Sequence, residues 1–320
     1  MPIVVGDTVY LFYSSTVALW HRPYRMTSST DNGKTWSEPI TLIDSDHKQK
    51  DKYDEVYAHG FSVEKGKNDK PDRILLGWEM RSGPKGHNKG GYGNFFAYFN
   101  CRDQKMYNAG GKDLGDTVDL QEMYSDCIIN DAKSPDSRPF GQTTLPEVLP
   151  DGSPGVLYTL NDKTYIAQWK EGTWKTTKLE VTGRISDYQR TNQGTYVILS
   201  SGNKNITNAA FDLINRAPFS NYAMLSGGNK NITVWESKNG VTGWQKRTVA
   251  ELPGEMGSDT AAYGFIDGFK PEVQWMAATY DRKNRKNDYS GKWPVYTFGA
   301  KRLSTNVEGK LVKSELKCLK

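Results

Sequence analysis

The sequence has no apolar run of the roughly 18 to 20 residues that a helix needs to cross a bilayer, so we expect neither a transmembrane helix nor a membrane partner. It also has little cysteine. Cys101, Cys127 and Cys318 are too few for a disulfide framework and do not show a zinc-ligand spacing. One pair of them could form a disulfide, and at least one thiol then stays free. Histidine is scarce as well, at 4 of 320 residues.

The first residues, Met1 to Asp7, have neither the basic head nor the long apolar segment of a secretory signal peptide. Two interpretations remain open at this point. The protein is either cytoplasmic, or it is exported and its leader is absent from this chain.

The excess of one charge sign is small, because 42 Lys and Arg face 37 Asp and Glu and the net charge is +5. The basic residues are scattered along the chain instead of forming a stripe, which argues against a nucleic-acid partner. A mild positive charge is compatible with ordinary solubility and with attraction to an acidic polysaccharide or oligosaccharide. We expect a monomer.

Aliphatic residues are modest in number, since all hydrophobic residues make up 36%, but aromatic residues reach 12% with 9 Trp and 18 Tyr. Together with 31 Gly, this composition favours many thin sheets with aromatic packing and tight turns. No amphipathic helix longer than two turns is evident, so we predict an all-β fold. The clearest strand-like runs are 9–13, 74–78, 94–99, 156–158, 164–169, 196–199 and 232–235.

One turn carries a specific motif. Residues Ser29–Trp36 match the Asp-box pattern S-x-D-x-G-x-x-W at every fixed position. In this pattern Asp31 caps a tight hairpin, Gly33 takes a backbone conformation closed to other residues, and Trp36 packs between neighbouring sheets. The motif marks a hairpin and not a catalytic centre. Weaker echoes occur at Ser237–Trp244 and Trp169–Trp174.

Repetition predicts the architecture. The nearly identical strings Leu199–Thr207 and Leu225–Thr233 and the turns above outline sheet units, which supports one β-propeller domain over residues 1–320, built of four-stranded antiparallel blades. Seven blades are favoured, six also fit and five remain an option. The last residues could complete the first blade and close the ring. The units are near 5–43, 56–108, 138–180, 184–212, 219–250 and 260–303.

Three stretches resemble BNR/Asp-box propellers, in particular the group related to ulvan lyases and rhamnose–glucuronate lyases. They are Arg22–Pro39, the stretch from His59 through Trp78 to Tyr98, and Pro271–Glu272 with Trp293–Gly299. The resemblance implies a secreted or periplasmic enzyme that acts on uronate-containing polysaccharide, commonly on a seven-bladed propeller and sometimes with a metal ion. It therefore favours the exported interpretation.

The innermost strand of each propeller blade lines the central channel, where ligands collect. The four candidate inner strands are Glu55–His59, Arg138–Gln142, Ser186–Arg190 and Asp259–Tyr263. They would bring imidazole, phenol, guanidinium and carboxylate groups to one place, which is a reasonable inventory for catalysis.

A polysaccharide lyase must neutralise the uronate carboxylate, remove the C5 proton and protonate the leaving oxygen. We interpret His59 as the base, because its pKa lies near working pH, and Tyr188 or Tyr263 as proton donor or acceptor. Arginines can bind the carboxylate as a fork. The predicted carboxylate-binding arginines are Arg81, Arg138 and Arg190.

The remaining predicted substrate contacts are His87, on a Gly-rich loop, and the pair Gln142 and Tyr158. The lyase group pairs a Tyr on an inner strand with an Arg near the end of the next strand, and Gln142 and Tyr158 stand at the comparable places. This departure leaves other activities open. His21 and His47 are interpreted as peripheral.

Two alternatives to a lyase follow. One is an exo-acting glycoside hydrolase, either rhamnosidase-like or sialidase-like, although Arg22–Tyr24 is a poor match to the early Arg-Ile-Pro motif of sialidases. The other is a non-catalytic carbohydrate-binding propeller. None of these interpretations requires a cofactor. The presence of a structural calcium or other divalent ion stays undetermined. Its possible ligands are Glu55, Asp187 and Asp259.

Overall fold

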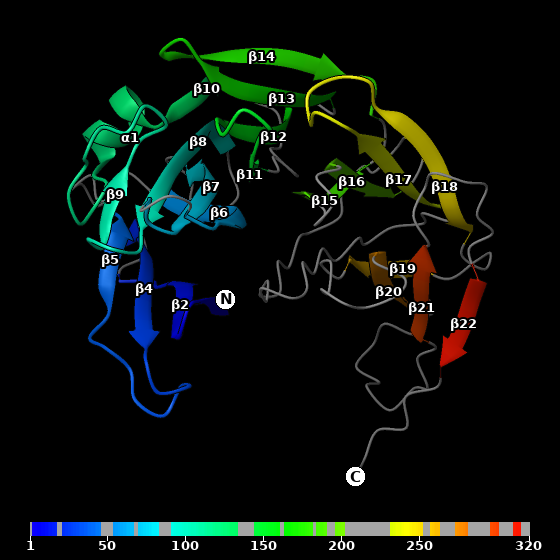
Figure 1. The fold of residues 1–320 in the computed structure, drawn as a ribbon, viewed down its shortest axis with the longest axis horizontal. Coiled ribbons are helices and arrows are strands. Elements are labelled where there is room, and N and C mark those ends of the chain that lie inside the picture. Colours follow the sequence, from blue (N-terminus) through cyan, green and yellow to red (C-terminus); the bar gives the residue numbers. More distant parts are fainter. Residues whose placement is uncertain are drawn as a thin grey trace. The chain divides into compact units, whose positions relative to one another are not determined.

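In a computed structural model, the described part of the chain folds into β-strands and one short helix (Figure 1). No helix in the described part of the chain is long and apolar enough to span a membrane. The strands group into two compact units, Met1–Leu179 and Glu180–Lys320. The structure describes residues 2–17, 21–45, 54–66, 70–82, 91–133, 144–160, 163–181, 184–190, 196–201, 231–251, 257–262, 273–280, 295–300 and 310–314.

The first unit contains three sheets in chain order. The first is fully antiparallel, and its strands in spatial order are β1 (Pro2–Val5), β2 (Thr8–Ser14), β4 (Tyr24–Ser29) and β5 (Ile40–Ile43). The third is also antiparallel, with strands β11 (Thr144–Val148), β12 (Pro154–Leu160), β13 (Lys163–Lys170) and β14 (Thr173–Leu179).

The second sheet is the largest, with the order β10-β8-β7-β6-β3 and one additional strand, β9, beside β8. The short strand β3 runs parallel to β6, whereas the other pairs are antiparallel. Its strands are β3 (His21–Arg22), β6 (Asp54–Glu64), β7 (Arg73–Ser82), β8 (Gly91–Asn100), β9 (Lys105–Tyr107) and β10 (Ile128–Lys133).

The second unit contains two four-stranded antiparallel sheets. One is formed by β15 (Arg184–Arg190), β16 (Tyr196–Ser201), β17 (Asn231–Ser237) and β18 (Gln245–Glu251). The other is formed by β19 (Gly257–Ala262), β20 (Val273–Tyr280), β21 (Val295–Ala300) and β22 (Lys310–Ser314).

The all-β class and the seven strand-like runs are confirmed, but two of the predicted sheet units are wrong. Residues 184–212 and 219–250 are not separate sheets, because β16 pairs with β17 in the register Leu199↔Val234. The described ends of the repeated strings, Leu199–Ser201 and Asn231–Thr233, therefore lie on neighbouring antiparallel strands of one sheet. The C-terminal strand also differs from expectation: Lys310–Ser314 pairs with β21, and residues 2–43 supply all four strands of the first sheet.

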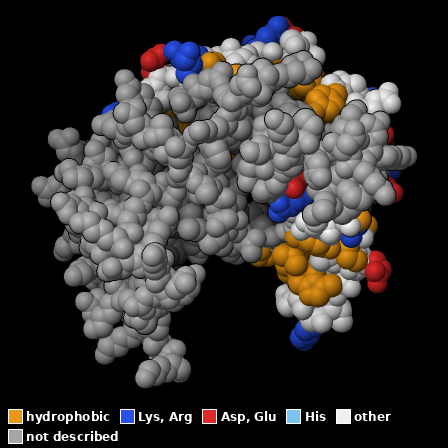
Figure 2. Space-filling model, turned by 180° about the vertical axis from the view of Figure 1, so that it is seen from behind, with side chains coloured by type: hydrophobic (Ala, Val, Ile, Leu, Met, Phe, Trp, Pro, Cys, Tyr) orange, Lys and Arg blue, Asp and Glu red, His pale blue; other side chains and the backbone are white. Residues whose placement is uncertain are grey.

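Aromatic side chains fill the core between the first and second sheets. The Trp78 and Phe95 rings stack with centroids 5.6 Å apart, and Phe12 meets Phe61 at 5.1 Å. Trp78 is fully buried, so these rings bury a large area from few strands. On the face seen in Figure 2, the described hydrophobic side chains gather over the first sheet, where Val4 is 45% exposed.

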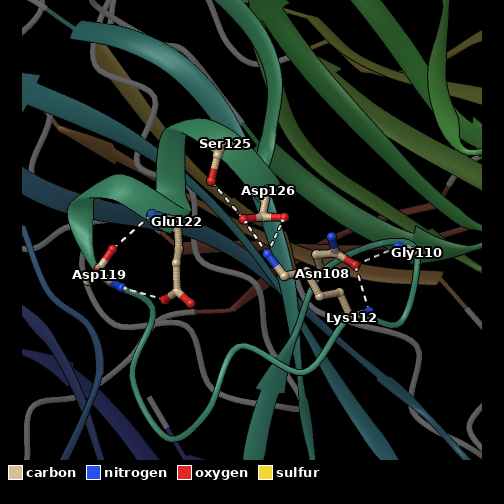
Figure 3. Close-up of polar contacts among 7 residues, drawn as sticks. All are labelled: Asn108, Gly110, Lys112, Asp119, Glu122, Ser125 and Asp126. Carbon is tan, nitrogen blue, oxygen red and sulfur yellow. Dashed lines mark hydrogen bonds and ion pairs between the residues drawn. The ribbon is translucent and has the colours of Figure 1, made fainter.

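A loop and the helix α1 (Leu120–Asp126) connect β9 to β10 (Figure 3). Asp119 caps the helix by accepting from the Glu122 amide at 2.8 Å, and the Glu122 carboxylate accepts from the Asp119 amide at 3.2 Å. The Lys112 ammonium binds both Asp126 oxygens at 2.9 Å. This capping box fixes the helix and the route of the chain into β10.

The Ser29–Trp36 turn joins the third and fourth strands of its sheet. Asp31 accepts from the Thr35 amide at 2.8 Å and from the Thr35 hydroxyl at 2.6 Å, and Gly33 has a φ of 85°. The predicted roles of Asp31 and Gly33 are thus confirmed. The prediction for Trp36 is wrong: it is 42% exposed, because its indole N–H donates to the Gly33 carbonyl and holds the ring over the turn.

The Ser237–Trp244 turn is a second copy in the same topological place, between β17 and β18. Asn239 replaces the aspartate, and its side-chain oxygen accepts from the Thr242 amide at 2.8 Å. Ser237 accepts from the Gly240 amide at 3.1 Å, as Ser29 does from Gly33 at 2.8 Å. The third-to-fourth-strand turn is therefore a recurring device of this fold.

We predict that replacing Thr35 raises the pKa of Asp31. Its hydrogen bonds, led by that from the Thr35 hydroxyl, lower this pKa from 3.8 to about 2. The turn therefore gains stability from the carboxylate above pH 3.8 and loses it as the pH falls through about 2. In Thr35→Val the pKa should move toward 3.8, measured by NMR of the carboxyl carbon. Thr30→Val is the control, and an equal shift there would contradict the assignment.

Candidate functional site

The two faces of the second sheet pack against different neighbours. Along β7, Trp78 and Met80 belong to the core shared with the first sheet, whereas Leu75 packs with Val148 and Val156 of the third sheet. Since side chains alternate along a strand, Glu79 lies on the face directed at the third sheet.

A row of polar residues crosses this face. Tyr57 of β6 pairs with Glu79 of β7, and Glu79 pairs with Asn94 of β8. Glu79 and Asn94 are fully buried, and Tyr57 is half-buried. Buried polar groups cost free energy unless they are hydrogen-bonded, so this polar row (Tyr57, Glu79 and Asn94) departs from the apolar packing around it.

The polar row continues into the third sheet. The Asn94 side-chain amide donates to the Thr144 hydroxyl at 2.8 Å, and Thr144 is fully buried at the start of β11. Tyr158 lies opposite Thr144 on β12, and its ring stacks on that of Tyr165 at 5.3 Å. The two sheets thus meet through hydrogen-bonding groups at this end of their interface and through apolar ones farther along.

Two glycines allow this close meeting. A Cβ atom at Gly77 would lie 2.6 Å from the Thr144 carbonyl oxygen, and one at Gly60 would lie 2.7 Å from both that oxygen and Pro146. Any other residue at these positions would push β11 away. Glycine is therefore required where the backbone of β11 crosses β6 and β7.

His59 occupies a β-bulge beside this crossing. The register of β6 and β7 shifts between Ala58↔Trp78 and Gly60↔Gly77, which leaves His59 as the extra residue. Bulges bend a strand and re-aim a side chain, and they are common next to active sites. The structure describes the backbone of His59 and not its side chain, so its role as base stays a prediction.

Of the other predicted residues, Arg81 lies on one of these strands. Arg81 pairs with Glu55, two residues from the Tyr57–Glu79 pair, and the structure gives only its backbone position. His87, Arg138 and Gln142 lie outside the described residues. In the sequence, Gln142 precedes Thr144, the first residue of β11, by two positions.

Tyr158 is placed in the interior, at 4% exposure, and burial is the main cause that raises its pKa. Its described contacts are those of a packed residue, and a substrate contact stays a prediction. The structure brings it to the same place as Thr144 and therefore next to the polar row.

In the second unit, Tyr188 and Arg190 lie on β15. Tyr188 is 3% exposed and packs against Tyr196 and Trp244, with its hydroxyl 3.5 Å from the Gly240 carbonyl. Arg190 is exposed, with its guanidinium 5.8 Å from the centre of the Tyr196 ring. Tyr263 lies outside the described residues. The functional roles of all three stay predictions.

The polar row itself was not predicted from the sequence. Glu79 ends an otherwise apolar run, Ile74–Trp78, and a carboxylate in such a run is the kind of signal that points to a functional site. Asn94 and Thr144 carried no comparable signal, because their meeting depends on how two sheets pack. In the described part of the chain, no three His, Cys, Asp or Glu side chains group in a way that could hold a metal ion.

No protein-family model matches the sequence, and no curated protein matches it. Solved structures do. The PL25 ulvan lyase, a polysaccharide lyase bound to -[GlcA(1-4)Rha3S]-, aligns over 87% of this chain with a TM-score of 0.60 and 18% identity. This chain and the ulvan lyase share a fold. The chain spans 61% of the length of that lyase.

A second structure of the ulvan lyase aligns equally well, with a TM-score of 0.60. An α-L-arabinofuranosidase from Clostridium thermocellum aligns over 96% of this chain and 93% of its own, with 12% identity and a TM-score of 0.41. The likeness to the ulvan lyase supports the β-propeller-like architecture expected from the sequence. The number of blades and the single domain over residues 1–320 stay predictions.

We predict that the Asn94–Thr144 bond joins the second and third sheets energetically. Thr144→Val keeps the shape but leaves the buried Asn94 amide without an acceptor, so the free energy of unfolding should fall by about 1–3 kcal/mol. In a double-mutant cycle with Asn94→Leu, measured by urea denaturation, the second substitution should cost less than it does alone. Strictly additive effects would contradict the coupling.

Proposed function

We propose that this protein is a carbohydrate-active enzyme that cleaves a uronate-containing polysaccharide by β-elimination. The observation that carries the proposal is the meeting of the polar row, the His59 bulge and the start of β11 at one end of the interface between the second and third sheets. The fold shared with an ulvan lyase supports the same reading. A secreted or periplasmic location belongs to this proposal.

In the proposed reaction, His59 takes the C5 proton of the uronate. The electron pair of that C–H bond forms the C4–C5 double bond while the bond from C4 to the glycosidic oxygen breaks. A tyrosine then gives a proton to the leaving oxygen. Arginine neutralises the uronate carboxylate, which makes the C5 proton acidic. Burial at a sheet interface strengthens such electrostatic contacts, because water competes less there.

One observation favours a glycoside hydrolase as the second candidate. Tyr57 and Glu79 pair directly across β6 and β7, and a phenol beside a carboxylate is an arrangement that can serve as nucleophile and base. In that reaction the Tyr57 oxygen would bond to the anomeric carbon as the glycosidic bond breaks and the departing oxygen takes up a proton, and water would then displace the tyrosine and release the sugar. The product distinguishes the two reactions.

The chemical class is tested by incubating the protein with uronate polysaccharides. We predict an absorbance increase near 235 nm from the unsaturated product. Reducing sugar without this absorbance would establish the hydrolase instead. The absence of both signals would indicate a binding protein. His59→Ala should lower the rate by about a hundredfold or more. His47→Ala is the matched control, and a full rate in His59→Ala would contradict the placement of the base.

A further inference from the structure

Arg22 stands at the half-buried end of the polar row. It is part of β3, and its position pairs with Glu55 on β6. Its Nη1 donates to the Tyr57 hydroxyl at 3.0 Å, and the guanidinium carbon lies 5.0 Å from the centre of the Tyr57 ring. One tyrosine therefore orients this cation by a hydrogen bond and by a cation–π contact.

The Arg22 cation has no counter-ion among the described residues. Its Nε is buried without a hydrogen-bond partner. Arg73, the other half-buried arginine of this sheet whose side chain is described, binds the Glu64 carboxylate. A partly desolvated guanidinium that lacks both an ion pair and a partner for Nε costs free energy. Binding an anion would recover that cost.

We propose that Arg22, oriented by Tyr57, binds the carboxylate of an acidic sugar at the half-buried end of the polar row. This inference rests on the proposed function, since it names the group that the site recognises in its substrate. A planar carboxylate fits the forked donors of a guanidinium better than a neutral sugar hydroxyl does.

Arg25 offers a matched comparison. Its Nε is also buried without a partner, but it lies on β4 of the first sheet, where it pairs with Tyr13 and Thr41 and not with the polar row. A general effect of losing an arginine should appear equally at both positions. A role in carboxylate recognition should appear at Arg22 only.

The test measures binding by calorimetry in the His59→Ala protein, so that the ligand persists. The probes are a glucuronate–rhamnose tetrasaccharide and the same tetrasaccharide with its carboxyl groups reduced to alcohols. Arg22→Lys keeps the charge and loses the fork, so it should weaken binding of the acidic probe by about 10- to 100-fold. Binding of the reduced probe should be unchanged, and Arg25→Lys should bind both probes as the parent protein does.

Tyr57→Phe is the second variant, and it keeps the ring under the guanidinium while removing the hydroxyl. It should weaken binding of the acidic probe by several-fold, which is less than Arg22→Lys. The proposal would be overturned by unchanged affinity in Arg22→Lys, or by equal losses for the two probes. A sulfated probe whose affinity depends on Arg22 through the sulfate alone would also overturn it.

The outcomes separate this inference from the proposed enzyme. If the wild-type protein binds the acidic probe through Arg22 but forms neither unsaturated product nor reducing sugar, the enzymatic proposal fails and the carboxylate site stands. If the wild-type protein cleaves the polysaccharide while Arg22→Lys binds the acidic probe normally, the enzymatic proposal stands and the carboxylate site at Arg22 fails.

Discussion

The backbone of β11 lies directly against Gly60 and Gly77, and the rest of the site depends on this contact. It sets the third sheet so close to the second that Thr144 reaches the amide of Asn94 at 2.8 Å. The same contact places the start of β11 beside the His59 bulge. A side chain in place of either glycine would separate the two sheets, and the hydrogen bond would be lost with the packing.

Burying the polar row costs free energy, and a role in binding or catalysis explains why polar residues stand there. Away from the polar row, the interface between these sheets is apolar. Its buried side chains there are Leu75, Phe96, Val148 and Val156. Burying Glu79 in the same interface is unfavourable compared with an apolar residue of similar size, because a carboxylate loses its hydration there. Polar groups kept in such a place commonly serve binding or catalysis, and the Arg22 guanidinium at the end of the row, whose Nε has no hydrogen-bond partner among the described residues, has the same character.

Local chemistry explains which features could be predicted from sequence. The turn at Asp31 and Gly33 was predictable, because its hydrogen bonds join residues at most four positions apart. The strand runs were predictable from their apolar and aromatic residues. The pairing of β16 with β17 was not, because residues 202–230 separate the two strands in the sequence and the repeated strings suggested two sheets where there is one. The bond from Asn94 to Thr144 spans 50 positions and depends on sheet packing.

The most direct test is a crystal structure of the His59→Ala protein with a uronate oligosaccharide. We predict that the sugar lies where the polar row meets the start of β11, with its carboxylate at Arg22 and Tyr57 and its reacting ring beside position 59. A sugar bound elsewhere on the protein, with Tyr57, Glu79 and Arg22 unchanged and distant from it, would contradict the account.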